Sequence, residues 1–228
     1  MEFSVIEKSL LFKGIDSYEI KAMMKCLDPE VETYHKNDFV AIEGHELKGI
    51  GLVLTGQVVI LKESYKGNGL VLRKINEGDI FGEVAVFSEK KKWPASIQAN
   101  TNCKIAFFRG QKMKGECPYL CPRHSKLIKN LLYLISSRAA GLNKKLDYLS
   151  IKSMRGKISA YLFDEYKNNQ TKSFRIKFNR KEMSEYLNVS RPSMSRELGK
   201  MRDEGIIDFH KSSFKILDLT ALKSMALN

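Results

Sequence analysis

The apolar spacing between residues 128 and 149 constrains the fold of this chain more than any other feature. Apolar side chains recur there at alternating intervals of four and three residues, the period of a helix that packs along one seam against another helix. The pattern lasts for three heptads and predicts a continuous helix from about Pro122 to Leu149. The expected dimerisation seam comprises Ile128, Leu132, Ile135, Ala139, Leu142, Leu146 and Leu149.

A second apolar stripe, made of Leu127, Leu131 and Leu134, lies beside this seam. A helix that only covers a core needs one apolar face, whereas this helix has two. One face can pack on the preceding domain and the other on a second copy of the chain, so the two stripes favour a homodimer. An ordinary core helix is the alternative.

The region before this helix has the pattern of a β-domain. After a short helical lead-in over residues 1–27, short apolar and β-branched runs are separated by turn signals at Gly56, Lys66-Gly67-Asn68-Gly69 and Gly78-Asp79. Many short strands with regular turns predict an antiparallel barrel or roll. The runs are residues 50–54, 58–61, 70–72, 80–81, 97–99 and 103–108.

The pattern changes again after Leu149. Ser153 is suited to cap a new helix from Met154 to about Lys167, and Phe174 to Phe178 has the pattern of a short strand. The chain is therefore expected to have three parts: a roll domain at residues 1–121, a dimerisation helix and hinge at residues 122–152, and a domain at residues 153–228.

Residues 179–205 have the pattern of two helices joined by a tight turn. Asn179 and Glu182 form a capping box for the first helix, which is expected to end at Leu187. Asn188 can take the left-handed conformation that the turn needs, and Ser190 can cap the second helix. The side chains expected to be buried between the helices are Val189, Met194, Leu198 and Met201.

The outer face of the second helix carries residues suited to DNA. An arginine can bond bidentately to O6 and N7 of guanine, whereas lysines and hydroxyls suit phosphate oxygens. Beyond Gly205, the runs 206–209 and 214–217 predict the hairpin of a winged helix. Helix-turn-helix pairs also occur in protein cores. The helix caps, the apolar Val189 between the helices, the exposed arginines and the predicted wing together favour DNA binding. The predicted DNA-binding residues are Lys181, Ser190, Arg191, Pro192, Ser193, Ser195, Arg196 and Lys200.

The charge distribution agrees with this placement. The net charge of +13 suggests a polyanionic partner. Residues 150–228 hold 16 Lys or Arg against 9 Asp or Glu, so the last third of the chain has about twice the net positive charge per residue of the rest.

In the order of its parts, the chain resembles the Crp/Fnr family of bacterial transcription regulators along nearly its whole length. The likeness is carried by Gly56, by residues 76–83 (NEGDIFGE), by residues 145–158 around the hinge and by residues 189–198 (VSRPSMSREL). It implies an α+β fold with an N-terminal double-stranded, jelly-roll-like β-roll with flanking helices, a long dimerisation helix and a C-terminal winged helix-turn-helix.

The resemblance also implies a function. A homodimer would bind a palindromic operator in double-stranded DNA, with one recognition helix in each half-site. An effector sensed in the roll would reorient the DNA-binding domains through the long helix, and RNA polymerase would be a further partner. Arg191 and Arg196 match the family's base-reading arginines, but Pro192 stands where many members have a glutamate, which predicts an altered half-site.

Residues 81–96 (FGEVAVFSEKKKWPAS) match the family's phosphate-binding cassette. In members that bind cyclic nucleotides, a glycine-glutamate pair starts a short helix, and a following arginine holds the cyclic phosphate. Gly82 and Glu83 are present, but Trp93 and Pro94 occupy the positions of the arginine and its neighbour, and Lys90 to Lys92 fit a solvated turn. The expected effector-binding residues are Gly82, Glu83, Val84, Ala85, Trp93, Pro94, Ala95, Ser96, Leu142 and Asn143.

The lost arginine predicts an effector other than cyclic AMP or cyclic GMP. Trp93 is expected either to floor a pocket for a flat or apolar effector or to pack the roll onto the long helix. A cyclic-nucleotide-responsive regulatory module remains an alternative.

The cysteines leave a second alternative open. Cys117 and Cys121 are four residues apart with His124 nearby, a spacing that could hold a metal or form a redox pair. The chain lacks the N-terminal cysteine cluster of the family's iron–sulfur branch, so neither metal nor cofactor is expected. Four cysteines in 228 residues, no run of eighteen apolar residues and an acidic N-terminus predict a cytoplasmic protein without a membrane partner. Scattered histidines and the lack of a nucleophile motif predict that it is not an enzyme.

Overall fold

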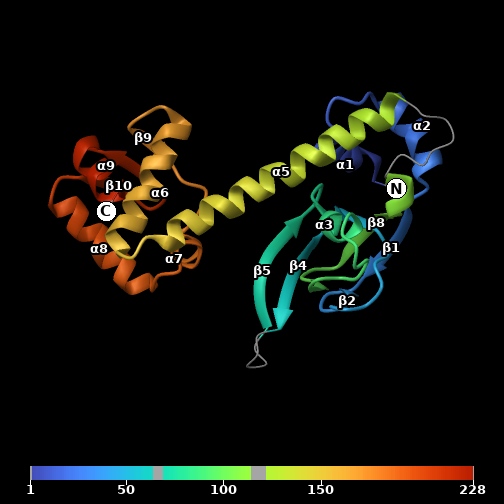
Figure 1. The fold of residues 1–228 in the computed structure, drawn as a ribbon, viewed down its shortest axis with the longest axis horizontal. Helices are drawn as coiled ribbons and strands as arrows, with labels where there is room; N and C mark the ends of the chain where they lie inside the picture. The colour runs from blue at the N-terminus through green and yellow to red at the C-terminus, as the bar shows by residue number, and fades with distance from the viewer. Residues whose placement is uncertain (1, 64–68, 114–121, 228) are drawn as a thin grey trace. The chain divides into compact units, whose positions relative to one another are not determined.

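The computed structural model describes residues 2–63, 69–113 and 122–227, and the chain forms two compact units, Met1–Ser137 and Arg138–Asn228 (Figure 1). The first unit holds a β-roll and its covering helices, and the second holds a winged helix-turn-helix. The long helix α5 (Pro122–Ser150) contributes to both units.

Two four-stranded antiparallel sheets build the roll. One sheet has the strand order β1-β8-β3-β6 and the other has the order β2-β7-β4-β5, with β4 and β5 forming a long hairpin (Figure 1). The strands are β1 (Glu30–Tyr34), β2 (Phe39–Ala41), β3 (Ile50–Thr55), β4 (Gln57–Glu63), β5 (Gly69–Asn76), β6 (Ile80–Phe81), β7 (Ser96–Ala99) and β8 (Cys103–Phe108).

Strands β3 and β8 are buried on both faces. Because successive side chains of a strand point to opposite faces, each of these strands contributes to two cores. Val53 and Phe107 lie in the core between the sheets, whereas Leu52 and Phe108 lie in a second core beneath the helices. Gly51 has no side chain because a Cβ there would come within 2.2 Å of the Phe81 ring. Two apolar layers therefore hold the roll together.

The second core of the roll is covered by helices from both ends of this unit: α1 (Phe3–Lys8), the 3-10 turn η1 (Leu10–Phe12), α2 (Ser17–Leu27), α4 (Gly110–Met113) and the first half of α5. The stripe Leu127, Leu131 and Leu134 is buried there, as predicted. The Asn130 amide fixes the helix further by donating hydrogen bonds to the carbonyls of Leu11 (3.0 Å) and Lys13 (2.9 Å).

The second unit has its own core, built from helices around a three-stranded antiparallel sheet in the order β10-β11-β9. Its elements are the end of α5, then α6 (Met154–Asn169), β9 (Ser173–Arg175), α7 (Arg180–Leu187), α8 (Arg191–Asp203), β10 (Ile207–His210), β11 (Ser213–Ile216) and α9 (Leu219–Leu227). Ser153 caps α6 by accepting a hydrogen bond from the Gly156 N–H (2.9 Å), as its position predicts.

An aromatic cluster joins the end of α5 to α6 and α7. The buried Tyr148 ring lies 5.9 Å from the rings of both Tyr161 and Tyr186, and its hydroxyl donates to the Asp164 carboxylate (2.8 Å). Burial and the Asp164 carboxylate raise the pKa of the Tyr148 hydroxyl, so it stays a hydrogen-bond donor. Lys144 completes the group with an ion pair to Asp164 (2.7 Å).

Several sequence predictions are confirmed, including the fold class, the strands between residues 50 and 108, and the helix ending near Leu149. Strands β1 and β2 were not foreseen, because the edge strand β1 carries charged residues and lacks an apolar run. The predicted strand from Phe174 to Phe178 is wrong at its end, since Phe178 stacks on Tyr161. The predicted turn at residues 66–69 falls mostly outside the described residues. None of the helices in the described part of the chain has the length and apolar character to cross a membrane.

Candidate functional site

The helix-turn-helix forms as the sequence predicts. Asn179 Oδ1 accepts from the Glu182 N–H (3.0 Å) and Glu182 Oε2 accepts from the Asn179 N–H (2.9 Å), which completes the capping box at the start of α7. Asn188 then takes the left-handed conformation (φ 52°, ψ 54°) that turns the chain into α8. Met194, Leu198 and Met201 are fully buried and fix the rotation of α8.

Burial of this stripe leaves the opposite face of α8 in solvent. Arg191, Pro192 and Arg196 are exposed, together with Ser190, Ser195 and Lys200. The Arg196 guanidinium donates to Ser193 Oγ (3.2 Å), which holds the arginine along the first turn of the helix. Ser193 is half-buried and also accepts a hydrogen bond from Ser190 Oγ (2.7 Å), so its hydroxyl organises the face. This face carries hydrogen-bond donors, which can bond to acceptor atoms of base edges and to phosphate oxygens.

Arg155 of α6 forms charged hydrogen bonds to α8 and to the residue that follows it, a contact that sequence reasoning missed. Its guanidinium bonds bidentately to Glu204 (2.7 and 2.8 Å) and through Nε to Glu197. Glu197 lies in α8 and Glu204 directly follows it, so one side chain of α6 contacts the second half of α8. These residues lie 42 and 49 positions apart, and nothing in the local pattern indicates the contact.

Replacing Arg155 with methionine is expected to lower the free energy of unfolding of the second unit by about 1–3 kcal/mol, because half-buried Glu197 loses its charged partner. The Arg155 hydrogen bond holds the pKa of Glu204 below its ordinary value of 4.5. A lowered carboxyl pKa stabilises the fold above that value, and this contribution is lost as the pH falls through the folded pKa. Urea unfolding at pH 7 and near pH 3 measures both effects.

The matched control is Lys181→Met, because the one ion pair of Lys181 with a described residue is its exposed pair with Glu185 (3.9 Å). This substitution should change the free energy of unfolding by less than about 0.5 kcal/mol. If Arg155→Met cost the same at both pH values, lost packing rather than lost charge would explain it.

In the first unit, the residues of the cassette (residues 81–96) build a tight turn followed by α3 (Glu83–Val86). Gly82 has φ 82°, and a Cβ there would lie 2.9 Å from the Gly49 carbonyl and 3.0 Å from the Trp93 ring. The Glu83 side chain is buried, whereas Val84 is 62% exposed. The predicted frame of the cassette is therefore present.

Trp93 points into the core between the sheets. It is 4% exposed, and its ring lies 6.0 Å from that of Phe81. The expectation that Trp93 packs the roll onto the long helix is wrong, since its cluster comes from the roll and includes none of the described residues of α5. Its backbone holds the cassette to the preceding loop, because the Trp93 N–H donates to the His45 carbonyl (3.0 Å) and the Trp93 carbonyl accepts from Gly44 (2.9 Å).

The remaining predicted effector residues differ in their surroundings. Lys90 to Lys92 are exposed, as a solvated turn requires, and Pro94 is exposed while Ala95 is buried. Ser96 Oγ accepts from the Glu43 N–H (3.0 Å) and so supports the loop. Leu142 and Asn143 are exposed residues of α5 that belong to the second unit.

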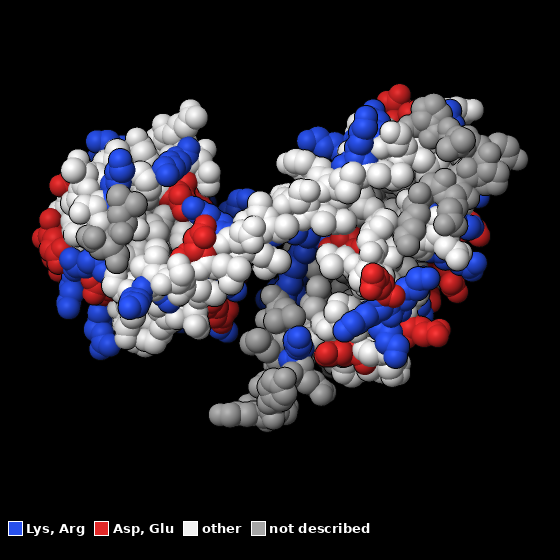
Figure 2. All heavy atoms as spheres, in the orientation of Figure 1, with Lys and Arg blue, Asp and Glu red and all other residues white. Residues whose placement is uncertain are grey.

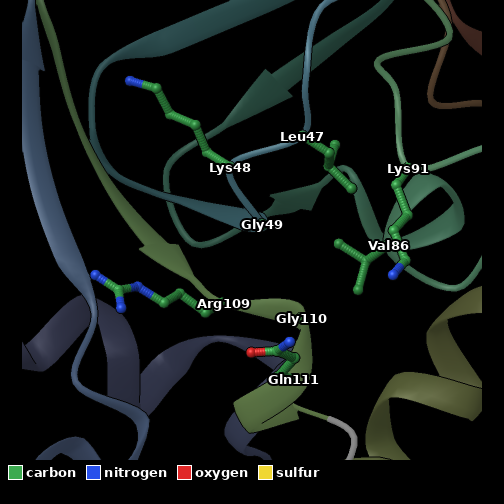
Figure 3. A pocket seen from close by; sticks show the side chains of 8 residues that line it. All are labelled: Leu47, Lys48, Gly49, Val86, Lys91, Arg109, Gly110 and Gln111. Atoms are coloured by element: carbon green, nitrogen blue, oxygen red, sulfur yellow. The ribbon is translucent and has the colours of Figure 1, made fainter.

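A pocket of about 230 Å³ opens beside the cassette, but none of the predicted effector residues lines it. Figure 3 shows the Lys91 side chain beside Val86, whereas Lys48 and Arg109 extend away from them. Lys48 is also engaged by Glu32 (2.7 Å). The cations therefore do not converge on one anion in this pocket, which is lined by Leu47, Lys48, Gly49, Val86, Lys91, Arg109, Gly110 and Gln111.

Cys117 and Cys121 lie outside the described residues. His124 is buried, and neither of its ring nitrogens bonds to a described residue. Burial lowers the pKa of His124, so the imidazole is held neutral. Among the residues that the structure describes, no group of three possible metal ligands is found.

Charge on the second unit is mixed. Figure 2 shows lysines and arginines on the face in view, interspersed with acidic side chains. On the face in view, charge alone therefore does not single out one patch, and the candidate DNA-binding face is identified by the exposed residues of α8.

Comparisons with known proteins match both units. Residues 31–117 match the family described as "Cyclic nucleotide-binding domain", and residues 156–225 match the "Crp-like helix-turn-helix domain". The chain is 22% identical over 184 residues to the cAMP-activated global transcriptional regulator CRP of Salmonella typhimurium, covering 79% of this chain and 86% of the relative. It is 21% identical over 196 residues to the cAMP-activated regulator Vfr of Pseudomonas aeruginosa, covering 81% and 90%.

The fold has solved counterparts. The catabolite activator protein of Thermus thermophilus superimposes with a TM-score of 0.54 at 21% identity, covering 96% of this chain and 99% of that one. The roll, the long helix and the winged helix-turn-helix thus occur together, in this order along the chain, in a solved fold. The two family matches follow each other along the chain and together cover more than half of it. The chain therefore belongs to the Crp/Fnr family and is a DNA-binding transcription regulator.

Proposed function

We propose that the protein acts as a homodimer that binds a two-fold-symmetric operator in double-stranded DNA. The observation that carries this proposal is the seam of α5, whose Leu132, Leu142 and Leu146 are 58%, 65% and 62% exposed. The neighbouring stripe of the same helix is buried in the roll, so the seam is a separate apolar face of the kind that a second copy covers. RNA polymerase is a further proposed partner, by family membership.

Each protomer would place α8 in one major groove. Arg191 and Arg196 would read guanines, and Ser190, Ser195, Lys181 and Lys200 would hold phosphates. Pro192 offers only apolar contact where a glutamate would accept from cytosine, so the half-site should differ from that of relatives with glutamate there. The cap and buried stripe of α8 support this assignment by fixing which face is outward.

Selection of binding sites from random DNA at fixed salt tests this proposal. We expect enrichment of inverted repeats whose half-sites lie about one helical turn apart, with guanine in each half-site. Enrichment of a single unrepeated site would contradict the dimer, and enrichment of no sequence would contradict the base contacts.

We further propose that the effector is not a cyclic nucleotide. The cassette keeps Gly82 and buried Glu83, but the position of the phosphate-binding arginine is held by Trp93, whose ring lies in the core. The guanidinium that would balance a cyclic phosphate is therefore missing, while the exposed Lys90 to Lys92 lie in the turn before it. A flat or apolar effector is proposed instead, because it needs no guanidinium to balance its charge.

A thermal-shift screen is expected to show no rise of the unfolding temperature with cyclic AMP or cyclic GMP. A ligand present at 100 times its Kd adds about 2.7 kcal/mol to stability, so binding would be visible. The screen should include haem and apolar aromatic compounds, with Glu83→Gln as the variant that separates cassette ligands from others. A strong rise with cyclic AMP that Glu83→Gln removes would overturn the proposal.

A further inference from the structure

An arginine of the first helix of the helix-turn-helix contacts both strands of the wing in the second unit. Arg180 is the first residue of α7, and its guanidinium carbon lies 4.6 Å from the centroid of the Phe209 ring and 4.9 Å from that of Phe214. The two phenylalanines are cross-strand partners of β10 and β11, and their ring centroids are 5.7 Å apart. A guanidinium over two ring faces makes a cation–π contact with both strands of the wing.

The surroundings of Arg180 distinguish it from the other cations near α8. Its Nη1 is buried and has no hydrogen-bond partner in the described chain, and no ion pair joins it to a described carboxylate. Burial also lowers the pKa of the guanidinium. Arg180 as a whole is half-buried, and its enclosed Nη1 is not open to a DNA phosphate, whereas the neighbouring Lys181 side chain is 73% exposed.

Further contacts tie the same wing down. Arg202 of α8 lies over the Phe209 ring at 5.7 Å, so that ring meets a cation from each helix of the pair. Ser212 Oγ donates to the Phe178 carbonyl (3.1 Å), just before α7. Between these anchors the turn of the wing exposes His210 and Lys211. The position of these two side chains relative to α8 thus depends on the Phe209–Phe214 pair.

We propose that Arg180 is a positioning residue that sets the wing, through its stacking on Phe209 and Phe214, where Lys211 reaches the DNA backbone, without touching DNA itself. The proposal rests on the DNA-binding function proposed above. Under this proposal Arg180 contributes to DNA affinity only by placing the wing. Lys211 is the phosphate contact that depends on this placement.

A lysine at position 180 distinguishes a positioning role from a direct phosphate contact. Lysine keeps the charge but lacks the planar group that stacks on both rings. If Arg180 positions the wing, Arg180→Lys and Arg180→Met should both weaken operator affinity about threefold to tenfold. Both should also reduce the slope of log affinity against log salt, by about the 0.9 expected for one lost phosphate contact.

A double-mutant cycle with Lys211→Met makes the test specific. In the otherwise unchanged protein, Lys211→Met should lower the salt slope by about 0.9, whereas in the Arg180→Lys background it should lower it no further. Lys181→Met is the matched control, because a direct phosphate contact on α7 should add to Arg180→Lys. Amide hydrogen exchange of residues 207–216, measured without DNA, should speed up in both Arg180 variants if the wing is released.

Two results would overturn the proposal. Normal affinity and slope in Arg180→Lys, with the slope lost in Arg180→Met, would make Arg180 a direct phosphate contact. A full effect of Lys211→Met in the Arg180→Lys background would mean that the wing keeps its place without the stacked guanidinium. Failure of the unchanged protein to bind DNA would instead refute the proposed function, and the hydrogen-exchange result would still report on the tether.

Discussion

Glutamate at both Leu142 and Leu146 is expected to convert the proposed dimer into a monomer. In the dimer these side chains would be buried between two copies of α5, where an unpaired carboxylate costs about 3–5 kcal/mol. Even one such cost raises the dimer dissociation constant more than about a hundredfold. Sedimentation equilibrium measures the change, and operator titration should show a parallel loss because a monomer engages only one half-site.

The matched control is Ser137→Glu, which places the same charge on an exposed position of α5 away from the seam. It should leave both the oligomeric state and the operator affinity unchanged. The double variant should also keep its circular dichroism spectrum, since 65% and 62% of the two leucines are already exposed in the protomer. A folded double variant that remains dimeric would show that the interface lies elsewhere.

Replacing Arg196 with alanine is expected to weaken operator binding by about 1–3 kcal/mol and to relax the preference at one base pair of each half-site. Arg196 is exposed on α8 and is held in place by Ser193 Oγ, so its guanidinium is pre-oriented for a guanine. Selected-site binding compared between the protein and the variant at one salt concentration measures both changes.

Lys200→Ala separates base reading from charge, since Lys200 lies on the same helix and is assigned to phosphate. That variant should weaken all sequences about equally and lower the salt slope by about 0.9. If Arg196→Ala gave this same pattern, with the base preference intact, Arg196 would be a phosphate contact and the recognition face would have to be reassigned.

Local chemistry explains which parts of the second unit could be predicted from sequence. The capping box of Asn179, the left-handed Asn188 and the cap at Ser190 act within four residues, so their signals are complete in a short stretch of chain. The buried stripe Met194, Leu198 and Met201 follows from helical period alone. These features were correct because no distant contact competes with them.

Contacts between distant segments were beyond sequence reasoning. The Arg155 network spans more than 40 residues, and the Arg180 contact with Phe209 and Phe214 appears only once β10 and β11 have paired. Trp93 was placed in the right loop, but the direction of its side chain depends on distant neighbours. Its ring packs against Gly82, where a Cβ would lie 3.0 Å away, and lies near the Phe81 ring. The edge strand β1 was missed because its pairing with β8, rather than its own composition, makes it a strand.

The anchoring of Tyr148 limits where a signal can bend the chain. Turning the DNA-binding unit about residues 151–153 would break the Tyr148–Asp164 hydrogen bond and part three aromatic rings, at a cost of about 2–5 kcal/mol. Effectors typically supply a coupling free energy of about 1–3 kcal/mol. The boundary between the two units falls inside α5, between Ser137 and Arg138. The last turns of α5, with the anchored Tyr148, therefore belong to the DNA-binding unit itself rather than to a linker that precedes it.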